Sequence, residues 1–159
     1  MTQQQHLAAQ ESNERNGKDE IVITAIEVKN EQVRLKFLPS KLGRYCTAFE
    51  NAIYNWMDRN AIAYNGGYWD FYTLSNGGFF LQPTKGYMIT SPNGFMDDAS
   101  AQEAGIIVTL MMLSHFSFVT DEKGHTKDCE RISAYFHQLR DFIFTLLPES
   151  QIKILNAID

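Results

Sequence analysis

The chain has 159 residues, which is long enough for one globular domain and too short for two ordinary ones. Hydrophobic residues make up 44% and charged residues 21%, close to soluble globular averages, so neither a disordered nor a fibrous protein explains the sequence. The 14 basic and 19 acidic residues give a net charge of −5. This balance argues against a surface that is basic throughout. It is also too mild for a dense carboxylate lattice that imitates DNA.

Three features of the sequence indicate a cytoplasmic protein: its cysteines, its most polar segment and its most apolar segment. Cys46 and Cys129 form no CxxC pair, which favours reduced thiols over a disulfide framework or a zinc ribbon. Residues 1–18 are rich in Gln, Asn and Glu, so we expect a mobile polar tail and no signal peptide, followed by one domain at 19–159. The most apolar window, 104–119, is shorter than the roughly 20 residues of a membrane span and predicts a buried helix.

The first half of the domain predicts strands followed by a helix. Residues 21–28 are rich in Ile, Val and Thr and predict a strand that ends in a turn. Apolar and polar residues alternate from Val33 to Phe37, which favours a second strand, with a short helix as the alternative, and Pro39 ends this segment. Between residues 44 and 59 apolar residues recur every three or four positions, which predicts an amphipathic helix.

Three short strands are predicted in the middle of the chain, at 68–74, 79–82 and 87–90. Asn76-Gly77 separates the first two, and this dipeptide readily adopts the positive φ angles of a tight hairpin turn. We therefore expect an antiparallel meander.

The last third predicts helices. Ser100 and Glu103 have the spacing of a capping box, so a helix should begin there, run to about residue 118 and form the centre of the core because it is apolar nearly all round. After a polar turn, Thr126 is expected to cap a second long helix that Pro148 ends, and a short helix follows. The predicted fold class is α+β: a single domain in which helices cover one face of a small antiparallel sheet.

The strand at 68–74 also predicts a surface. Alternation puts Trp69 and Phe71 on a face that suits the core. The opposite face presents Asp70 between the phenols of Tyr68 and Tyr72, which is a candidate recognition patch. The structural alternative is that Asp70 simply bonds to neighbouring hydroxyls. The predicted interaction surface consists of Tyr68, Asp70, Tyr72, Asn76, Gly77, Asp97 and Asp98.

No pattern of residues predicts catalysis or a metal site. His115 lies in the most apolar helix, which favours a hydrogen-bonded core histidine over a base or a ligand. No two histidines have HxxxH or HExxH spacing, and Asp97-Asp98 lacks the alternating acids of a calcium loop. Cys46 is better explained as a small buried helix residue than as a nucleophile. We therefore expect no catalytic residue, metal, cofactor or small-molecule substrate.

Several longer strings carry a resemblance to a known family. They are FLPSKLGR (37–44), GGYWDFYTLSNGGF (66–79), Ser-Pro-Asn-Gly (91–94), AQEAGIIVTLMMLSH (101–115) and YFHQLRDF (135–142). In these strings and in their order, the chain resembles the ArdB/KlcA-type antirestriction proteins over roughly residues 20–159.

The resemblance implies an accessory protein of plasmids, phages or genomic islands. Such a protein protects incoming DNA by inhibiting type I restriction–modification enzymes in the cytoplasm, directly or indirectly, without catalysis, without DNA mimicry and without a membrane. It supplies no catalytic residue that could be transferred to this chain.

Two other classes of function stay open. The first is a DNA-binding module for branched or translocating DNA, although Lys41, Arg44 and Arg59 beside one helix are a weak signal for phosphate contacts. The second, a hydrolase or nuclease, would need a metal or a nucleophile that no motif supplies.

Overall fold

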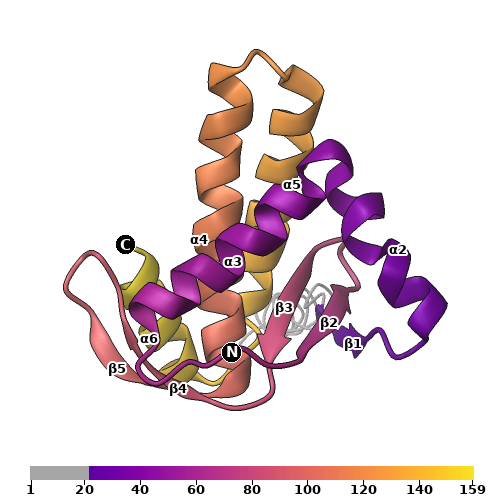
Figure 1. The fold of residues 1–159 in the computed structure, drawn as a ribbon. Coiled ribbons are helices and arrows are strands. Elements are labelled where there is room, and N and C mark those ends of the chain that lie inside the picture. Colours follow the sequence, from indigo (N-terminus) through magenta and orange to yellow (C-terminus); the bar gives the residue numbers. More distant parts are fainter. Residues whose placement is uncertain (1–21) are drawn as a thin grey trace, which may run out of the picture.

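The computed structural model describes residues 22–159, and the tail predicted at 1–18 lies outside these residues. The elements in chain order are β1 (Ala25–Glu27), α2 (Glu31–Leu42), the short 3-10 helix η1 (Gly43–Tyr45), α3 (Cys46–Asn60), β2 (Trp69–Leu74), β3 (Phe79–Pro83), β4 (Tyr87–Thr90), β5 (Met96–Ala99), α4 (Ala101–Glu122), α5 (Thr126–Ile143) and α6 (Pro148–Ile158). Figure 1 shows α4 and α5 as a long antiparallel pair that rises from a base containing the strands, with α3 crossing in front of it. The α+β fold class is confirmed.

The first sheet has the strand order β1-β2-β3 and is antiparallel throughout. The predicted hairpin between β2 and β3 is confirmed. Of the Asn76-Gly77 pair, Gly77 alone has a positive φ, +95°, which a glycine adopts without strain, and Asn76 does not. Helices pack on both faces of this sheet, where the sequence predicts one covered face. Phe37 of α2 stacks on Phe71, with ring centroids 5.2 Å apart, and Phe142 of α5 stacks on Phe80 at 5.9 Å.

The prediction that β4 continues the meander is wrong, because β4 pairs with β5 in a separate two-stranded sheet. Helix α4 occupies the outer edge of β3, where a further strand would have to pair. The Leu81 N–H donates to Oγ1 of Thr109 on α4 at 3.2 Å. The Leu81 carbonyl faces Gly105 so closely that a Cβ at this residue would clash with it. The Leu81 N–H at this edge of β3 is thus satisfied by a helix that fills the edge, and β4 pairs with β5 instead.

The strand predicted at 33–37 is wrong, and the helical alternative is correct. Asn30 caps α2, because its Oδ1 accepts a hydrogen bond from the Val33 N–H at 3.2 Å. Val33 is exposed, whereas Phe37, Leu38 and Leu42 are buried, so the burial follows helical rather than strand spacing. Pro39 lies inside α2 and does not end it.

Helix α4 is the centre of the core, as predicted. The capping box is present in full: the Glu103 N–H donates to Oγ of Ser100 at 3.1 Å, and the Ser100 N–H donates to Oε1 of Glu103 at 2.9 Å. Every residue from 103 to 110 is buried. By length and composition alone α4 could cross a membrane, but 67% of its apolar window is buried inside the fold, which is typical of a core helix.

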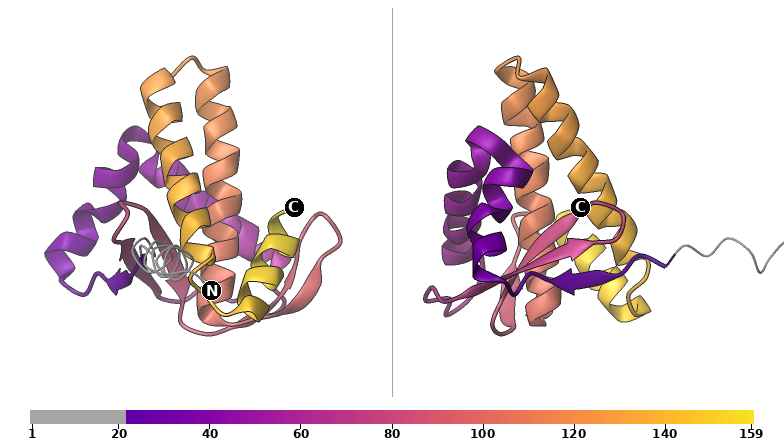
Figure 2. Two further views of the ribbon diagram at one scale, coloured as in Figure 1. Left: turned by 180° about the vertical axis from the view of Figure 1, so that it is seen from behind. Right: turned by 90° about the vertical axis from the view of Figure 1, so that its right-hand side faces the viewer.

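The two C-terminal helices differ from the predictions at their ends. The N-cap of α5 is His125, without a side-chain cap bond, and Thr126 is the first helical residue. Helix α5 ends at Ile143, and Pro148 begins α6 at the N-terminal site where proline has no amide hydrogen to lose. Seen from behind, α5 and α6 lie on the side of α4 opposite to α3 (Figure 2).

Candidate functional site

The predicted patch on β2 is divided between exposed and packed residues. Tyr68 is 61% exposed and lies just before the strand, and Asp70 is half-buried. Tyr72 stacks on Phe80 with ring centroids 4.9 Å apart, so its ring packs within the sheet. Burial raises the pKa of Tyr72, and the carboxylates of Glu27 and Asp70 add to the effect. The phenol therefore stays neutral at physiological pH.

The Asn76-Gly77 turn is attached to α5. Nδ2 of Asn76 donates to the carbonyl of Gln138 at 2.8 Å, and Oδ1 of Asn76 accepts a hydrogen bond from the Gly78 N–H at 3.1 Å. Both polar ends of the asparagine side chain thus have partners within the fold, which gives this residue a structural task.

Asp97 and Asp98 lie on β5, in the other sheet, and are exposed. They pair across the β4–β5 ladder with Ile89 and Met88. Figure 1 shows this hairpin at the opposite side of the base from the β2–β3 turn, so the structure does not bring the predicted residues together in one patch.

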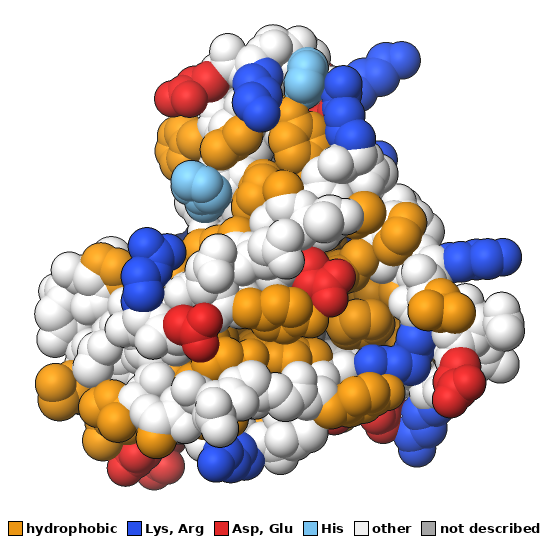
Figure 3. All heavy atoms as spheres, viewed as in Figure 1, with side chains coloured by type: hydrophobic (Ala, Val, Ile, Leu, Met, Phe, Trp, Pro, Cys, Tyr) orange, Lys and Arg blue, Asp and Glu red, His pale blue; other side chains and the backbone are white. Residues whose placement is uncertain are grey.

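A groove of about 510 Å³ opens between α2, the beginning of α3 and the beginning of β2. Its lining includes Glu31, Arg34, Leu35, Cys46, Glu50 and Tyr68. Figure 3 shows hydrophobic side chains gathered over this region, with acidic side chains on either side. Of the residues that the sequence predicts for the interaction surface, Tyr68 is the one that lines this groove. Leu35, which is 75% exposed, forms part of its apolar wall.

Arg34 fixes one wall of the groove. Its Nη2 donates to the carbonyl of Trp69 at 2.7 Å, which ties α2 to the first residue of β2. Its guanidinium carbon lies 4.5 Å from the ring centroids of both Tyr68 and Phe71, within the range of cation–π attraction. The cation therefore holds Tyr68 in place at the rim, and its charge is directed at groups of the fold.

The carboxylates of the groove come from two helices. Glu31 is exposed in the first turn of α2, where a negative charge is favoured by the helix dipole. Glu50 is half-buried on α3, and its Oε1 accepts a hydrogen bond from the Tyr54 hydroxyl at 2.6 Å. Burial, and then this bond to Glu50, raises the pKa of Tyr54, so the phenol remains a donor. The lining thus carries two carboxylates and one guanidinium, which makes it mildly acidic.

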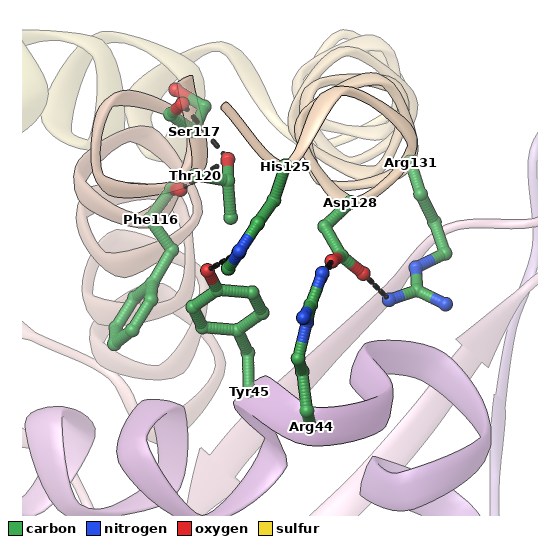
Figure 4. A network of polar contacts seen from close by, with 8 residues as sticks. All are labelled: Arg44, Tyr45, Phe116, Ser117, Thr120, His125, Asp128 and Arg131. Carbon is green, nitrogen blue, oxygen red and sulfur yellow. Dashed lines mark hydrogen bonds and ion pairs between the residues drawn. The ribbon is translucent and has the colours of Figure 1, made fainter. Parts of the chain in front are cut away.

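A second polar arrangement joins the tip of the α4–α5 hairpin to η1 and α3 (Figure 4). Asp128 lies between two guanidinium groups: Arg44 donates to Oδ2 at 2.7 Å and Arg131 donates to Oδ1 at 2.7 Å. The hydrogen bonds from Arg44 hold the pKa of Asp128 below its usual value. Beside this group the Tyr45 hydroxyl bonds to Nδ1 of His125. The hairpin is thereby fastened to the α2–α3 corner.

The prediction that His115 is a hydrogen-bonded core histidine is wrong, because its side chain is exposed. It lies on the part of α4 that rises above the base and, together with Ser114 and Arg140, lines a second hollow of about 450 Å³. Cys46 lies in the first groove, and no histidine is among the residues that line that groove. Within residues 22–159, no three His, Cys, Asp or Glu side chains are grouped so that they could hold a metal ion.

Sequence reasoning misses the groove because its α2 wall is predicted as a strand. The available signal is Asn30 followed by Glu31, an N-cap with an acid in the first turn. The Arg44–Asp128 pair gives no such signal, since the two residues are 84 positions apart in the sequence.

The fold defines the class of protein. A solved structure with 35% sequence identity superposes with a TM-score of 0.75, and the match covers 90% of this chain and 99% of that one. It comes from work on the KlcA and ArdB proteins, which are described as having a novel fold and antirestriction activity against type I DNA restriction systems in vivo but not in vitro. This is the class of small α+β proteins to which the present fold corresponds.

Sequence comparison assigns the family. Residues 62–159 match the profile of the family described as "Antirestriction protein". An antirestriction protein KlcA of Escherichia coli is 37% identical over 124 residues, which cover 76% of this chain and 84% of the relative. The uncharacterized protein YfjX of Escherichia coli K12 is 34% identical over 147 residues, 88% of this chain and 90% of the relative. The chain belongs to the antirestriction protein family, and the resemblance seen in the sequence is confirmed.

Proposed function

We propose that this protein protects incoming DNA by inhibiting type I restriction–modification enzymes in the cytoplasm, through contact with a protein of the restriction complex, without catalysis and without imitating DNA. The observation that carries the proposal is the 35% identity and TM-score of 0.75 to a structure from the work on KlcA and ArdB, over 90% of the chain. Those proteins have antirestriction activity against type I systems in vivo but not in vitro.

The surface chemistry supports the mode of action. A DNA mimic needs an ordered array of unpaired carboxylates, whereas Asp128 is paired with two arginines and Glu103 lies 3.6 Å from Nζ of Lys153. The face in Figure 3 carries basic and acidic side chains side by side. The groove that contains Cys46 offers apolar walls and carboxylates, which suit binding better than nucleophilic chemistry.

The contact surface that we propose is centred on Tyr68, with Asp70 next to it on β2. Tyr72 and the Asn76-Gly77 turn would support this surface through the fold. Asp97 and Asp98 form a separate exposed segment on β5, which we propose as a second part of the contact.

The experiment is the plating of unmodified phage on cells that carry a type I system, with and without the protein. We expect plating to be restored while the restriction subunits remain present, and modified phage to plate equally in both strains. No restoration by soluble protein would refute the proposal. A folded Asp70→Ala variant that protects fully would remove Asp70 from the contact surface.

A second candidate function, binding to branched or translocating DNA, is favoured by one observation. Cations gather near the hairpin tip: Arg44 and Lys123 each lie 5.8 Å from the ring centroid of Tyr45, and Arg131 shares Asp128 with Arg44. We expect the protein to retard the migration of forked DNA duplexes. This retardation should weaken as the salt concentration is raised, and Arg44→Ala should reduce it. Equal mobility with and without the protein at low salt would exclude it.

A further inference from the structure

The groove between α2, α3 and β2 has a chemistry that specifies its occupant. Its walls are apolar, with Leu35 and Tyr68 strongly exposed at the rim. Large exposed apolar side chains that are grouped together commonly mark a contact with another molecule. The volume of about 510 Å³ lies within the range of roughly 300–1,000 Å³ that is usual for ligand sites.

The charged residues that line the groove determine which charge its occupant should carry. Glu31 and Glu50 contribute two carboxylates, and the guanidinium of Arg34 is directed at the Trp69 carbonyl and at two aromatic rings. An approaching group therefore meets two carboxylates and one guanidinium, so the lining carries a net formal charge of −1. Phosphates would be repelled here, which argues against nucleic acid as the occupant. Lysine or arginine side chains would be attracted.

The shape of the groove determines the kind of molecule. It is open on one side, whereas small-molecule sites usually enclose most of the ligand surface. A protein segment needs no such enclosure, because one apolar side chain can enter the groove while its neighbours stay at the rim.

We propose that this groove binds a segment of a partner protein in which an aliphatic or aromatic residue is flanked by lysine or arginine. The apolar residue would pack on Leu35 and Tyr68, and the flanking cations would lie near Glu31 and Glu50. The inference rests on the proposed function in that the partner belongs to the restriction complex, but the binding chemistry is measured without that complex.

The first test is fluorescence anisotropy with a labelled peptide in which a leucine pair is flanked by lysines. Replacing the lysines with glutamates, or the leucines with serines, gives the two control peptides. We expect the first peptide to bind more tightly than either control. Glu31→Gln and Glu50→Gln should each weaken its binding about two- to fivefold, as is typical of exposed charge pairs. Leu35→Ser should weaken it by about tenfold.

A matched control separates groove binding from general attraction to an acidic protein. Glu149 is an exposed carboxylate in the first turn of α6, away from the groove lining, so Glu149→Gln changes the net charge by the same amount. It should leave peptide affinity unchanged. Equal losses in Glu149→Gln and Glu50→Gln, or equal binding of all three peptides, would overturn the proposal.

The half-buried thiol of Cys46 provides a second readout inside the groove. In a Cys129→Ser background, the leucine–lysine peptide should slow alkylation of Cys46, and the glutamate peptide should not. Unchanged alkylation at saturating peptide would place the peptide elsewhere and refute the inference.

Plating of unmodified phage distinguishes this inference from the proposed function. Protection that survives in folded Leu35→Ser, together with absent peptide binding, refutes the groove proposal and leaves the antirestriction proposal standing. If the peptide binds at the groove but the protein does not protect unmodified phage, the binding chemistry is supported and the proposed function is refuted. Concentration-dependent dimerisation that Leu35→Ser abolishes would identify a second copy as the occupant and overturn the proposal.

Discussion

Gly105 is the point at which α4 makes its closest approach to β3, and its replacement by alanine is a direct test of the packing described above. A Cβ on Gly105 would lie 2.9 Å from Cα of Gln82 and closer still to the carbonyl oxygen of Leu81. Ordinary van der Waals contact begins at 3.4 Å, so α4 and β3 would have to separate by at least 3.4 − 2.9 = 0.5 Å. The neighbours Ile106 and Ile107 are fully buried, so the helix cannot move without disturbing the core.

The magnitude follows from two opposing effects. Alanine gains about 1 kcal/mol over glycine in a helix interior. Overpacking of a dense core costs typically about 1–3 kcal/mol and more where backbone must move. The separation would also stretch the hydrogen bond from the Leu81 N–H to Thr109 beyond its present 3.2 Å and partly forfeit it. We expect Gly105→Ala to lower the free energy of unfolding by about 2 kcal/mol and Tm by about 4–8 °C.

Urea unfolding followed by tryptophan fluorescence measures this change, because Trp56 and Trp69 are both buried. Gln102→Ala, in the first turn of the same helix, serves as the control and should change stability by less than about 0.5 kcal/mol. A Gly105→Ala protein as stable as the wild type would refute the close approach of α4 to β3 and, with it, the explanation of why β4 leaves the first sheet.

Three further changes test single contacts. Thr109→Val keeps the shape but leaves the Leu81 N–H unpaired, which should cost about 1–3 kcal/mol in urea unfolding, whereas Thr109→Ser should retain most of the stability. Ser100→Ala removes the cap of α4 and should lower the free energy of unfolding by about 1 kcal/mol, and an unchanged Tm would contradict this. The lowered pKa of Asp128 means that its carboxylate stabilises the fold above its unfolded pKa of about 4 and loses this contribution as the pH falls through the lower folded pKa. The stability difference between wild type and Asp128→Asn should therefore be largest above about pH 5 and shrink below pH 4, and a difference constant with pH would contradict the assignment.

Local signals explain which elements the sequence predicts well. The capping box of Ser100 and Glu103 and the Asn76-Gly77 turn each involve residues within three positions of one another, and both are confirmed. The apolar stripe of α4 is equally local, although it overstates burial near its end. His115 and Phe118 are exposed because the helix continues beyond the base of the molecule.

The remaining features depend largely on contacts between distant residues, although Asn30 and Glu31 give α2 a local start signal. The pairing of β4 depends on Thr109 reaching Leu81, 28 residues earlier in the chain. The helical state of α2 depends on Phe37 packing against the rings of Phe71 and Phe79, and this tertiary contact outweighs an alternation that resembles a strand. The groove depends on the helical state of α2, because this helix forms one of its walls.

Under the proposed function, the distribution of charge gives this domain two surfaces for contact with a restriction complex. The groove presents two carboxylates with an apolar wall. Near the hairpin tip, Arg44 of η1 and Arg131 of α5 bind Asp128, and Lys123 lies near the ring of Tyr45. A target that contains both protein and DNA offers a partner to each surface, and neither surface alone needs high affinity when the two bind together.

Variants of the two surfaces test this reasoning. Leu35→Ser perturbs the groove and Arg44→Ala the tip, and each should reduce phage plating in part. If the two surfaces contact different partners, the reductions in the logarithm of plating efficiency should add in the double variant. If the double variant protects phage as well as the less protective of the two single variants, one surface carries the whole activity. In that case the groove and the tip would have to be assigned separately, and the surface whose single variant is inactive would be the inhibitory one.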